Sequence, residues 1–153
     1  MKTFFFFLLL LCTNISAHAQ GNSCNTLKKL VNDLPNDFKN VKGAYESDFD
    51  GSKQYGLKVM PEGWSMGNLI QDGKKLYISL LTDSEENEEA GKQKFDAFAK
   101  EIAACFSVTG VDDTNSFGHP TLTFTKGNAK LILLLTPIDE KYYVSLNIEK
   151  VKY

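Results

Sequence analysis

The chain has 153 residues, of which 42% are hydrophobic, and its formal net charge is −2 at pH 7. A chain of this length can bury the core of one ordinary domain. The charge is nearly balanced and no basic stripe runs along the sequence, which excludes a surface built to bind nucleic acid or an anionic membrane.

The N-terminus has the three parts of a secretory signal peptide. A short positive start precedes the apolar run Phe4–Leu11, and Ala17-His18-Ala19 forms a small-residue cleavage pattern. The apolar run is shorter than the about 20 residues that span a bilayer, although a buried N-terminal helix is an alternative. We predict a signal peptide over residues 1–19 and one α+β domain over residues 20–153. The mature protein is then exported, periplasmic or extracellular, without a membrane anchor.

Two cysteines remain after residue 19, Cys24 and Cys105, and each lies on the apolar side of a helical pattern. The apolar positions are Leu27, Leu30, Val31 and Leu34 in the first pattern and Phe95, Phe98, Ala99, Ile102 and Phe106 in the second. Because an exported chain meets an oxidising compartment, we predict a disulfide between the two helices. Two separately buried thiols are the alternative.

The first half of the chain is expected to form a helix and then strands. The helix begins near Cys24, with Asn22 and Ser23 as candidate N-caps, and Pro35 interrupts it. The polar segment 44–52 is expected to be a turn-rich connection. Strands are then predicted at 54–60, 65–71 and 75–82, and Asp72-Gly73 predicts a hairpin between the last two.

An acidic run, residues 83–89, precedes the second helix. Its carboxylates favour the first turn of a helix, where they offset the helix dipole, and Thr82-x-x-Glu85 fits a capping box. Gly91 costs ~1 kcal/mol in a helix interior relative to alanine, so the helix is expected to start after it. Calcium binding by the acidic run is an alternative, but the alternating ligand spacing is missing.

Three strand-like runs close the chain, at 121–125, 130–136 and 142–149. The first and third alternate polar and apolar residues, while the second is apolar almost throughout. Short connections favour antiparallel neighbours, so we predict a meander with the leucine-rich strand in the middle.

An internal echo extends this organisation to the whole chain. Lys75–Leu80 is similar in sequence to Lys141–Leu146, and each segment follows a helix. We therefore predict an α+β fold, an antiparallel sheet with two helices packed on one face, in the order α-β-β-α-β-β(-β). A duplication is one explanation of the echo, and chance similarity between strands is the other.

If both helices pack on one face, strand alternation assigns Tyr77, Ser79, Thr123, Tyr143 and Ser145 to the other face. Tyrosine combined with serine or threonine makes adaptable contacts at low entropic cost. We predict that these residues, together with the single tryptophan Trp64, bind another protein. A plain solvated face is the alternative, because the same residue types are good strand formers.

The chemical motifs of common enzymes are missing from the sequence. His119 is the one histidine after residue 19, and no nucleophile elbow, metal-binding pair or phosphate loop is present. We expect no cofactor and no metal. The leading hypothesis is a non-catalytic binding module of inhibitor or immunity type. One alternative is a carrier for a small apolar ligand, and another is a hydrolase that uses the loop carboxylates Asp48, Asp50, Asp112 and Asp113.

Overall fold

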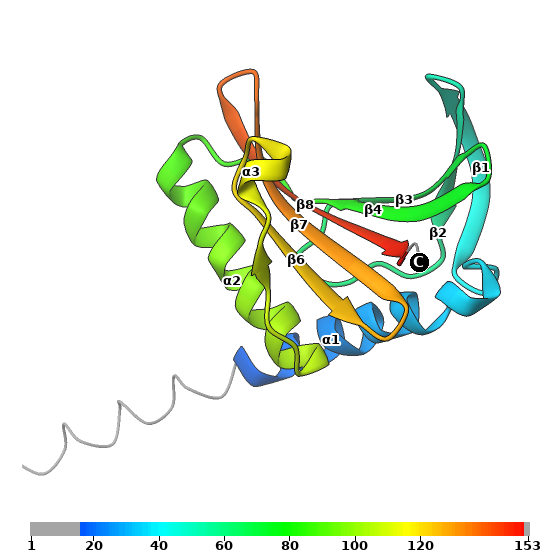
Figure 1. The fold of residues 1–153 in the computed structure, drawn as a ribbon, viewed down its shortest axis with the longest axis horizontal. Helices are drawn as coiled ribbons and strands as arrows, with labels where there is room; N and C mark the ends of the chain where they lie inside the picture. Colours follow the sequence, from blue (N-terminus) through cyan, green and yellow to red (C-terminus); the bar gives the residue numbers. More distant parts are fainter. Residues whose placement is uncertain (1–15, 152–153) are drawn as a thin grey trace, which may run out of the picture.

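The computed structural model describes residues 16–151 (Figure 1). The first part of the chain contains α1 (Ser16–Asn32), the 3-10 helix η1 (Leu34–Asn36), β1 (Lys42–Phe49), β2 (Ser52–Leu57), β3 (Met66–Asp72) and β4 (Lys75–Leu81). The second part contains α2 (Glu88–Phe106), β5 (Val111–Asp112), α3 (Thr114–Phe117), β6 (Thr121–Lys126), β7 (Ala129–Ile138) and β8 (Lys141–Lys150).

All eight strands form one antiparallel sheet in the order β1-β2-β3-β4-β8-β7-β6-β5. The prediction of an α+β fold with an antiparallel sheet is therefore confirmed. The predicted element order was too short: it had two strands after the first helix and two or three after the second, whereas four strands follow each long helix. The closing strands of the two halves, β4 and β8, lie side by side in the middle of the sheet, and Leu80 pairs with Leu146.

The predicted meander is present, with β7 between β6 and β8. Leu133 of β7 pairs with Leu122 on one side and with Leu146 on the other, so this strand lies deep in the sheet. Its apolar sequence fits the cover on both of its faces: Leu131, Leu133 and Leu135 are at most 2% exposed on the core side, and Ile132 is 6% exposed on the other side.

The segment 44–52 was wrongly predicted as a connection, since most of it belongs to β1. β1 is an edge strand with a single neighbour, β2, and most of its side chains are exposed. Nothing therefore required an alternation of polar and apolar residues, which is the signal that marks a strand. Two shifts in the β1–β2 register, on either side of Tyr45, mark irregularities of the kind found at sheet edges.

The predicted start of the first helix was also wrong. Asn22 and Ser23 lie inside α1 and are not N-caps: the Asn22 carbonyl accepts a hydrogen bond from Thr26 Oγ1 (3.0 Å), and Ser23 Oγ donates to the Glu62 carbonyl (3.3 Å). The break at Pro35 is confirmed, because α1 ends at Asn32 and Pro35 is the second residue of the separate short helix η1.

The second helix starts earlier than expected, and its N-cap is Asn87 in place of the predicted Thr82. Asn87 Oδ1 accepts a hydrogen bond from the Ala90 N–H (2.9 Å), and the first turn carries Glu88 and Glu89 as predicted. Gly91 lies within α2 because a Cβ there would come within 2.8 Å of Tyr142 Cβ. Close approach of helix to sheet thus outweighs the propensity cost of glycine.

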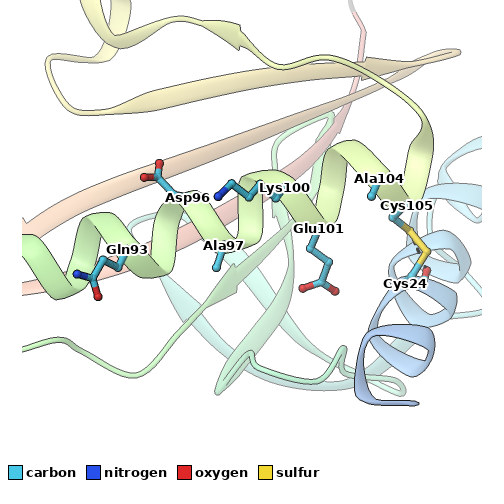
Figure 2. Close-up of a pocket in the computed structure, with 8 residues that line it drawn as sticks. All are labelled: Cys24, Gln93, Asp96, Ala97, Lys100, Glu101, Ala104 and Cys105. Carbon is cyan, nitrogen blue, oxygen red and sulfur yellow. Dashed lines mark hydrogen bonds between the residues drawn. A yellow bond between two sulfur atoms is a disulfide. The ribbon is translucent and has the colours of Figure 1, made fainter. Parts of the chain in front are cut away.

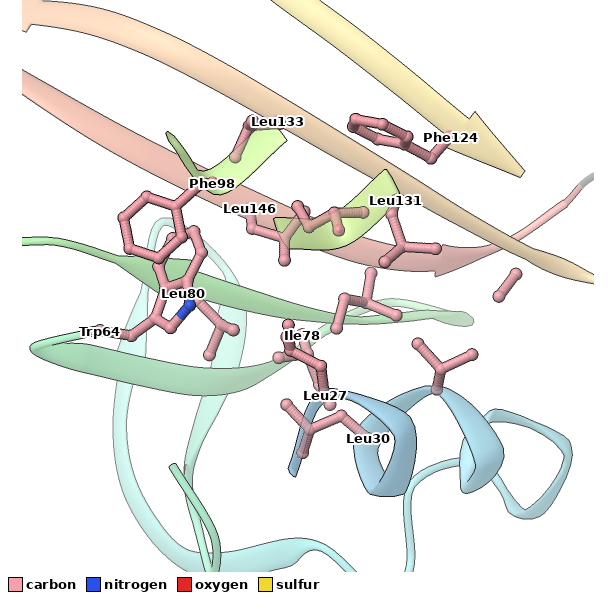
Figure 3. Close-up of a cluster of buried hydrophobic side chains, with 14 of the residues drawn as sticks. Leu27, Leu30, Trp64, Ile78, Leu80, Phe98, Phe124, Leu131, Leu133 and Leu146 are labelled. Atoms are coloured by element: carbon pink, nitrogen blue, oxygen red, sulfur yellow. The ribbon is translucent and has the colours of Figure 1, made fainter. Parts of the chain in front are cut away.

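The core lies between the helices and the sheet (Figure 3). Leu27 and Leu30 of α1 and Ile102 of α2 are fully buried, in one cluster with Ile78 and Leu146 of the central strands. α2 packs against β6, β7, β8 and α1. Both helical patterns predicted from the sequence therefore supply the buried side of their helices.

The predicted disulfide is present, joining Cys24 in α1 to Cys105 in α2 with a Cα–Cα distance of 5.5 Å. Residues 1–15 of the predicted signal peptide lie outside the described residues, and residues 16–19 belong to α1. Among the described residues, no helix combines the length and the apolar character that crossing a bilayer requires.

Candidate functional site

The sheet face opposite the core, called here the distal face, is built from three rows of side chains that run across the strands. The middle row contains Gly56, Asn68, Ser79, Asn147, Ile132 and Thr123, each paired with the next across β2, β3, β4, β8, β7 and β6. One flanking row contains Met66, Leu81, Ser145 and Leu134, and the other contains Ile70, Tyr77, Glu149, Lys130 and Thr125.

Strand alternation explains why these residues share a face. Their neighbours along the strands, such as Ile78, Leu80 and Leu146, are 0% exposed and point into the core. The residues between them therefore point the other way, and most are half-buried. The sheet is strongly curved, and the β1–β2 hairpin at its edge and the β7–β8 hairpin in its interior both project toward the top of the view (Figure 1).

Glu46 of β1 extends the distal face beyond the middle row. Its carboxylate accepts a hydrogen bond from Asn68 Nδ2 (2.7 Å), and Asn68 lies two strands away on β3. The contact is possible because Gly56 lies between them: a Cβ at Gly56 would come within 2.6 Å of Glu46 Oε1. A glycine on the intervening strand thus allows a carboxylate to reach across the sheet.

Charged residues close one side of the distal face. Lys75 Nζ forms an ion pair with Glu149 Oε2 (2.7 Å) and lies 4.9 Å from the centre of the Tyr77 ring. Lys130 pairs with Glu149 across β7 and β8. Lys75 thus contacts both the Glu149 carboxylate and the Tyr77 ring.

The residues of β5 and α3 form a corner at the β5 edge of the sheet, called here the α3 corner. Asp113 accepts hydrogen bonds from Ser116 Oγ (2.7 Å) and Thr123 Oγ1 (3.1 Å), and these bonds hold the pKa of its carboxyl below the usual value. The pKa of Asp112 is lowered as well, by hydrogen bonds from Thr114. Both carboxylates thus stay ionised and serve to fix the corner.

The structure brings five of the six predicted binding residues together. Tyr77 and Ser79 lie on β4, Ser145 lies on the adjacent strand β8 and Thr123 lies on β6, all within the three rows. Tyr143 of β8 has the same facing but lies beyond the rows, where it pairs with Thr136. Trp64 lies elsewhere. It is 5% exposed and packs on Phe98 of α2, with ring centres 4.4 Å apart.

Sequence reasoning missed Glu46, Gly56 and the β3 residues Met66 and Asn68. The strand predicted at 65–71 already contained Met66, Asn68 and Ile70, and their alternation with core-side residues would have placed them on this face. Glu46 and Gly56 carried no comparable signal, because the contact between Glu46 and Asn68 depends on the curvature of the sheet and on the register of the edge hairpin.

Figure 2 shows a second candidate, a groove of about 770 Å³ along α2 beside the disulfide. Its charged lining consists of Asp96, Lys100 and Glu101, and both of its sulfur atoms are oxidised in the Cys24–Cys105 bond. Among the side chains that the structure describes, the lining holds no free thiol, hydroxyl nucleophile or histidine, so these residues form no set of groups for nucleophilic catalysis.

A smaller cavity of about 330 Å³ lies where η1 meets the ends of β4 and β8. Its apolar walls come from Leu34, Phe38, Leu76 and Val151, and lysines stand around it. This volume is near the lower end of the range for small-molecule sites, about 300–1,000 Å³.

The four candidate catalytic carboxylates do not share a cleft. Asp48 and Asp50 belong to the β1–β2 hairpin, while Asp112 and Asp113 lie at β5, so the two pairs occupy opposite edges of the sheet. His119 follows α3, and its carbonyl accepts a hydrogen bond from Thr121 Oγ1 (2.7 Å). Among residues 16–151, no cluster of three or more His, Cys, Asp or Glu residues could hold a metal ion.

Comparisons with known proteins give no relative. No protein-family model matches the chain, and no curated protein or solved structure shows significant similarity to it.

Proposed function

We propose that the protein is an exported, non-catalytic binding module that recognises another protein, as an inhibitor or an immunity-type factor would. In this proposal α1 and α2 pack on one face of the sheet, and the distal face makes the contact. The single observation that carries the proposal is the middle row, which sets Asn68, Ser79 and Asn147 side by side among the apolar residues Ile132, Leu81 and Leu134.

The composition of the distal face supports recognition of a protein. Protein interfaces combine apolar contact area with about one hydrogen bond per 100–200 Å². Half-buried Leu81 and Leu134 supply the first, and the amide and hydroxyl groups of the middle row supply the second. Strand residues are already ordered before binding, so less side-chain entropy is lost on association.

The extent of the distal face also fits the recognition of a protein domain. The middle row crosses five strand-to-strand spacings from β2 to β6, which at ~4.8 Å each is roughly 24 Å. A standard interface covers about 800 Å² per partner, so one partner domain can contact the whole row. The hydrolase alternative gains no support, since its carboxylates lie on opposite edges of the sheet.

Site-specific photo-crosslinking tests the proposal. A photoreactive amino acid is placed at Ser79 or at Asn147 in the full chain, and a matched control carries it at Ala97, an exposed residue of α2. Each protein is exposed to the extracellular or periplasmic fraction of its source. We expect an adduct of the same mass from positions 79 and 147 and none from position 97.

A competition arm makes the result specific. Unlabelled wild-type protein should suppress the adduct, and Ser145→Arg, which places a long cation on the distal face, should fail to do so. An adduct that forms equally at Ala97, or its absence at Ser79 and Asn147 in protein with native Trp64 fluorescence, contradicts the proposal.

A further inference from the structure

The cavity beside η1 shares Lys75 and Glu149 with the distal face, but its apolar walls lie outside the three rows of that face. It is walled by Leu34, which is 4% exposed, by Phe38, which is 1% exposed, and by Leu76 and Val151. The two most buried of these walls belong to the connection after α1, while the other two belong to the ends of the central strands. An apolar body entering here is therefore enclosed by two separate parts of the chain.

The wall is held in place before any ligand binds. Asp37 and Phe38 both have left-handed backbones, with φ values of 55° and 58°. L-amino acids disfavour this conformation by roughly 1–2 kcal/mol per residue. The Phe38 N–H donates to the Asp33 carbonyl (3.1 Å), and Asp33 Oδ2 accepts hydrogen bonds from the N–H groups of Asn40 (2.8 Å) and Val41 (3.1 Å). These bonds fix Phe38 in the wall, and a preformed wall lowers the entropic cost of binding.

The charges around the cavity determine the sign of the charge that its ligand carries. Among the lining residues that the structure describes, Lys74, Lys75 and Lys150 stand against Asp37 and Glu149, which leaves one positive charge in excess. Lys75 is paired with Glu149 (2.7 Å), whereas Lys74 and Lys150 form no ion pair among the described residues. An anionic group at the mouth of the cavity would therefore meet two ammonium groups on flexible stems.

We infer that this cavity binds a small organic anion with an apolar body, such as a medium-chain carboxylate. The apolar part lies against Leu34, Phe38 and Leu76, and the carboxylate lies near Lys74 and Lys150. The volume of about 330 Å³ favours a short chain over a membrane lipid. This site is distinct from the contact that the distal face makes in the proposed function, and its ligand is charged, unlike the small apolar ligand that the sequence suggested as an alternative.

Titration with octanoate, observed by two-dimensional NMR of the full chain, tests the inference. We expect saturable shifts of the amide signals of Leu76 and Val151. Octanol and octylammonium have the same apolar body without the negative charge, and each should bind at least 10-fold more weakly. Equal binding of octanoate and octanol would overturn the inference, as would the absence of saturable shifts with octanoate.

Two variants test the charged mouth and the apolar wall separately, and a third serves as the control. The double variant Lys74→Glu/Lys150→Glu should weaken octanoate binding at least 10-fold. Lys100→Glu/Lys126→Glu makes the same change in net charge away from the cavity and should leave the affinity within 2-fold of wild type. Val151→Phe fills the cavity without a charge change and should abolish the shifts. Melting temperatures of all variants check that each one folds.

The distal-face variant Ser145→Arg should bind octanoate as the wild type does. If it loses both the protein adduct and octanoate binding, the two sites are not independent and the inference is wrong in that respect. Octanoate binding that survives in both Lys74→Glu/Lys150→Glu and Val151→Phe would place the ligand elsewhere and overturn the assignment.

Discussion

The two halves of the molecule have the same order of elements, a long helix followed by four strands, but they end differently. In the first half, the outer strand β1 runs over eight residues, and most of its side chains are exposed. In the second half, the outer strand β5 has two residues, and the buried strands β7 and β8 carry much of the core. The difference indicates that the second half supplies more of the buried apolar area, while the first half projects an exposed hairpin.

The halves are joined by the disulfide and by the pairing of the central strands. The largest effect on stability is expected from removing the disulfide. Removing the Cys24–Cys105 disulfide with Cys24→Ser/Cys105→Ser should lower the free energy of unfolding by ~4 kcal/mol, since the bridge spans 81 residues. Chemical denaturation followed by Trp64 fluorescence measures the loss. Wild-type protein under reducing conditions is the control and should unfold at the same denaturant concentration as the variant. Unchanged stability would show that strand pairing alone holds the halves together.

Gly91→Ala tests the tight contact of α2 with the second half of the sheet. Helix propensity alone predicts a gain of ~1 kcal/mol. We expect a loss of about 1–3 kcal/mol, because the new Cβ would come within 2.8 Å of Tyr142 Cβ and 3.1 Å of Leu135 Cδ1. Ala104→Gly, at an exposed position of the same helix, is the matched control and should cost ~1 kcal/mol. A more stable Gly91→Ala protein would mean that the helix can move away from the sheet.

Asp33→Asn probes the corner that leads from α1 into the exposed hairpin of the first half. The Asp33 carboxylate is buried, and it accepts hydrogen bonds from Asn40 Nδ2 (2.6 Å) and from the N–H groups of Asn40 and Val41. Its neutral replacement should cost about 1–3 kcal/mol of stability at pH 7, measured by thermal unfolding. Asp37→Asn, at an exposed position four residues on, should change stability by less than about 0.5 kcal/mol.

The same carboxyl predicts a pH dependence. Burial raises the pKa of Asp33, but the hydrogen bonds from Asn40, Val41 and Asn36 outweigh it and hold the pKa below the usual value. A depressed pKa in the folded state stabilises the protein above the unfolded pKa of about 3.9, and this contribution is lost as the pH falls through the folded value. The stability difference between wild type and Asp33→Asn should therefore be constant at neutral pH and shrink below about pH 4. A difference that grew on acidification would contradict this assignment.

The smallest effect is expected at the tip of the first hairpin. Phe49 is 69% exposed, so Phe49→Ser should change the free energy of unfolding by less than about 0.5 kcal/mol. Amide hydrogen exchange gives the corresponding comparison in the wild type: β1 amides should exchange earlier than those of β7. Equal protection of the two strands would show that the sheet opens as one cooperative unit.

Buried elements of the fold were predicted from the sequence better than exposed ones. The second-half meander was recognised because β7 is apolar almost throughout and its neighbours alternate, so the residue types reveal the pattern of burial. The strand β1 was not predicted, because a strand at an exposed edge does not need to alternate polar and apolar residues. Gly91 led to a wrong start for the second helix. Its role is to allow a close contact with Tyr142, 51 residues away, and helix propensity carries no information on such a contact.

The candidate site divides in the same way. Tyr77, Ser79, Tyr143 and Ser145 were found from alternation alone, since β4 and β8 are central strands with a strict two-residue period. Trp64 was included for its residue type, but it precedes β3 and turns into the core against Phe98. The cavity beside η1 could not be predicted, because two successive left-handed residues set the direction of the chain there.

The spacing of the two cysteines also orders events during synthesis. Cys24 leaves the ribosome long before Cys105, so its sulfur must wait until α2 has been made before the native bridge can close. Cys12 is the one other cysteine in the chain, and removal of residues 1–19 would take it away. After that step no mispaired bridge can form within a single molecule, and oxidation of the remaining pair would act as a record that both long helices have met.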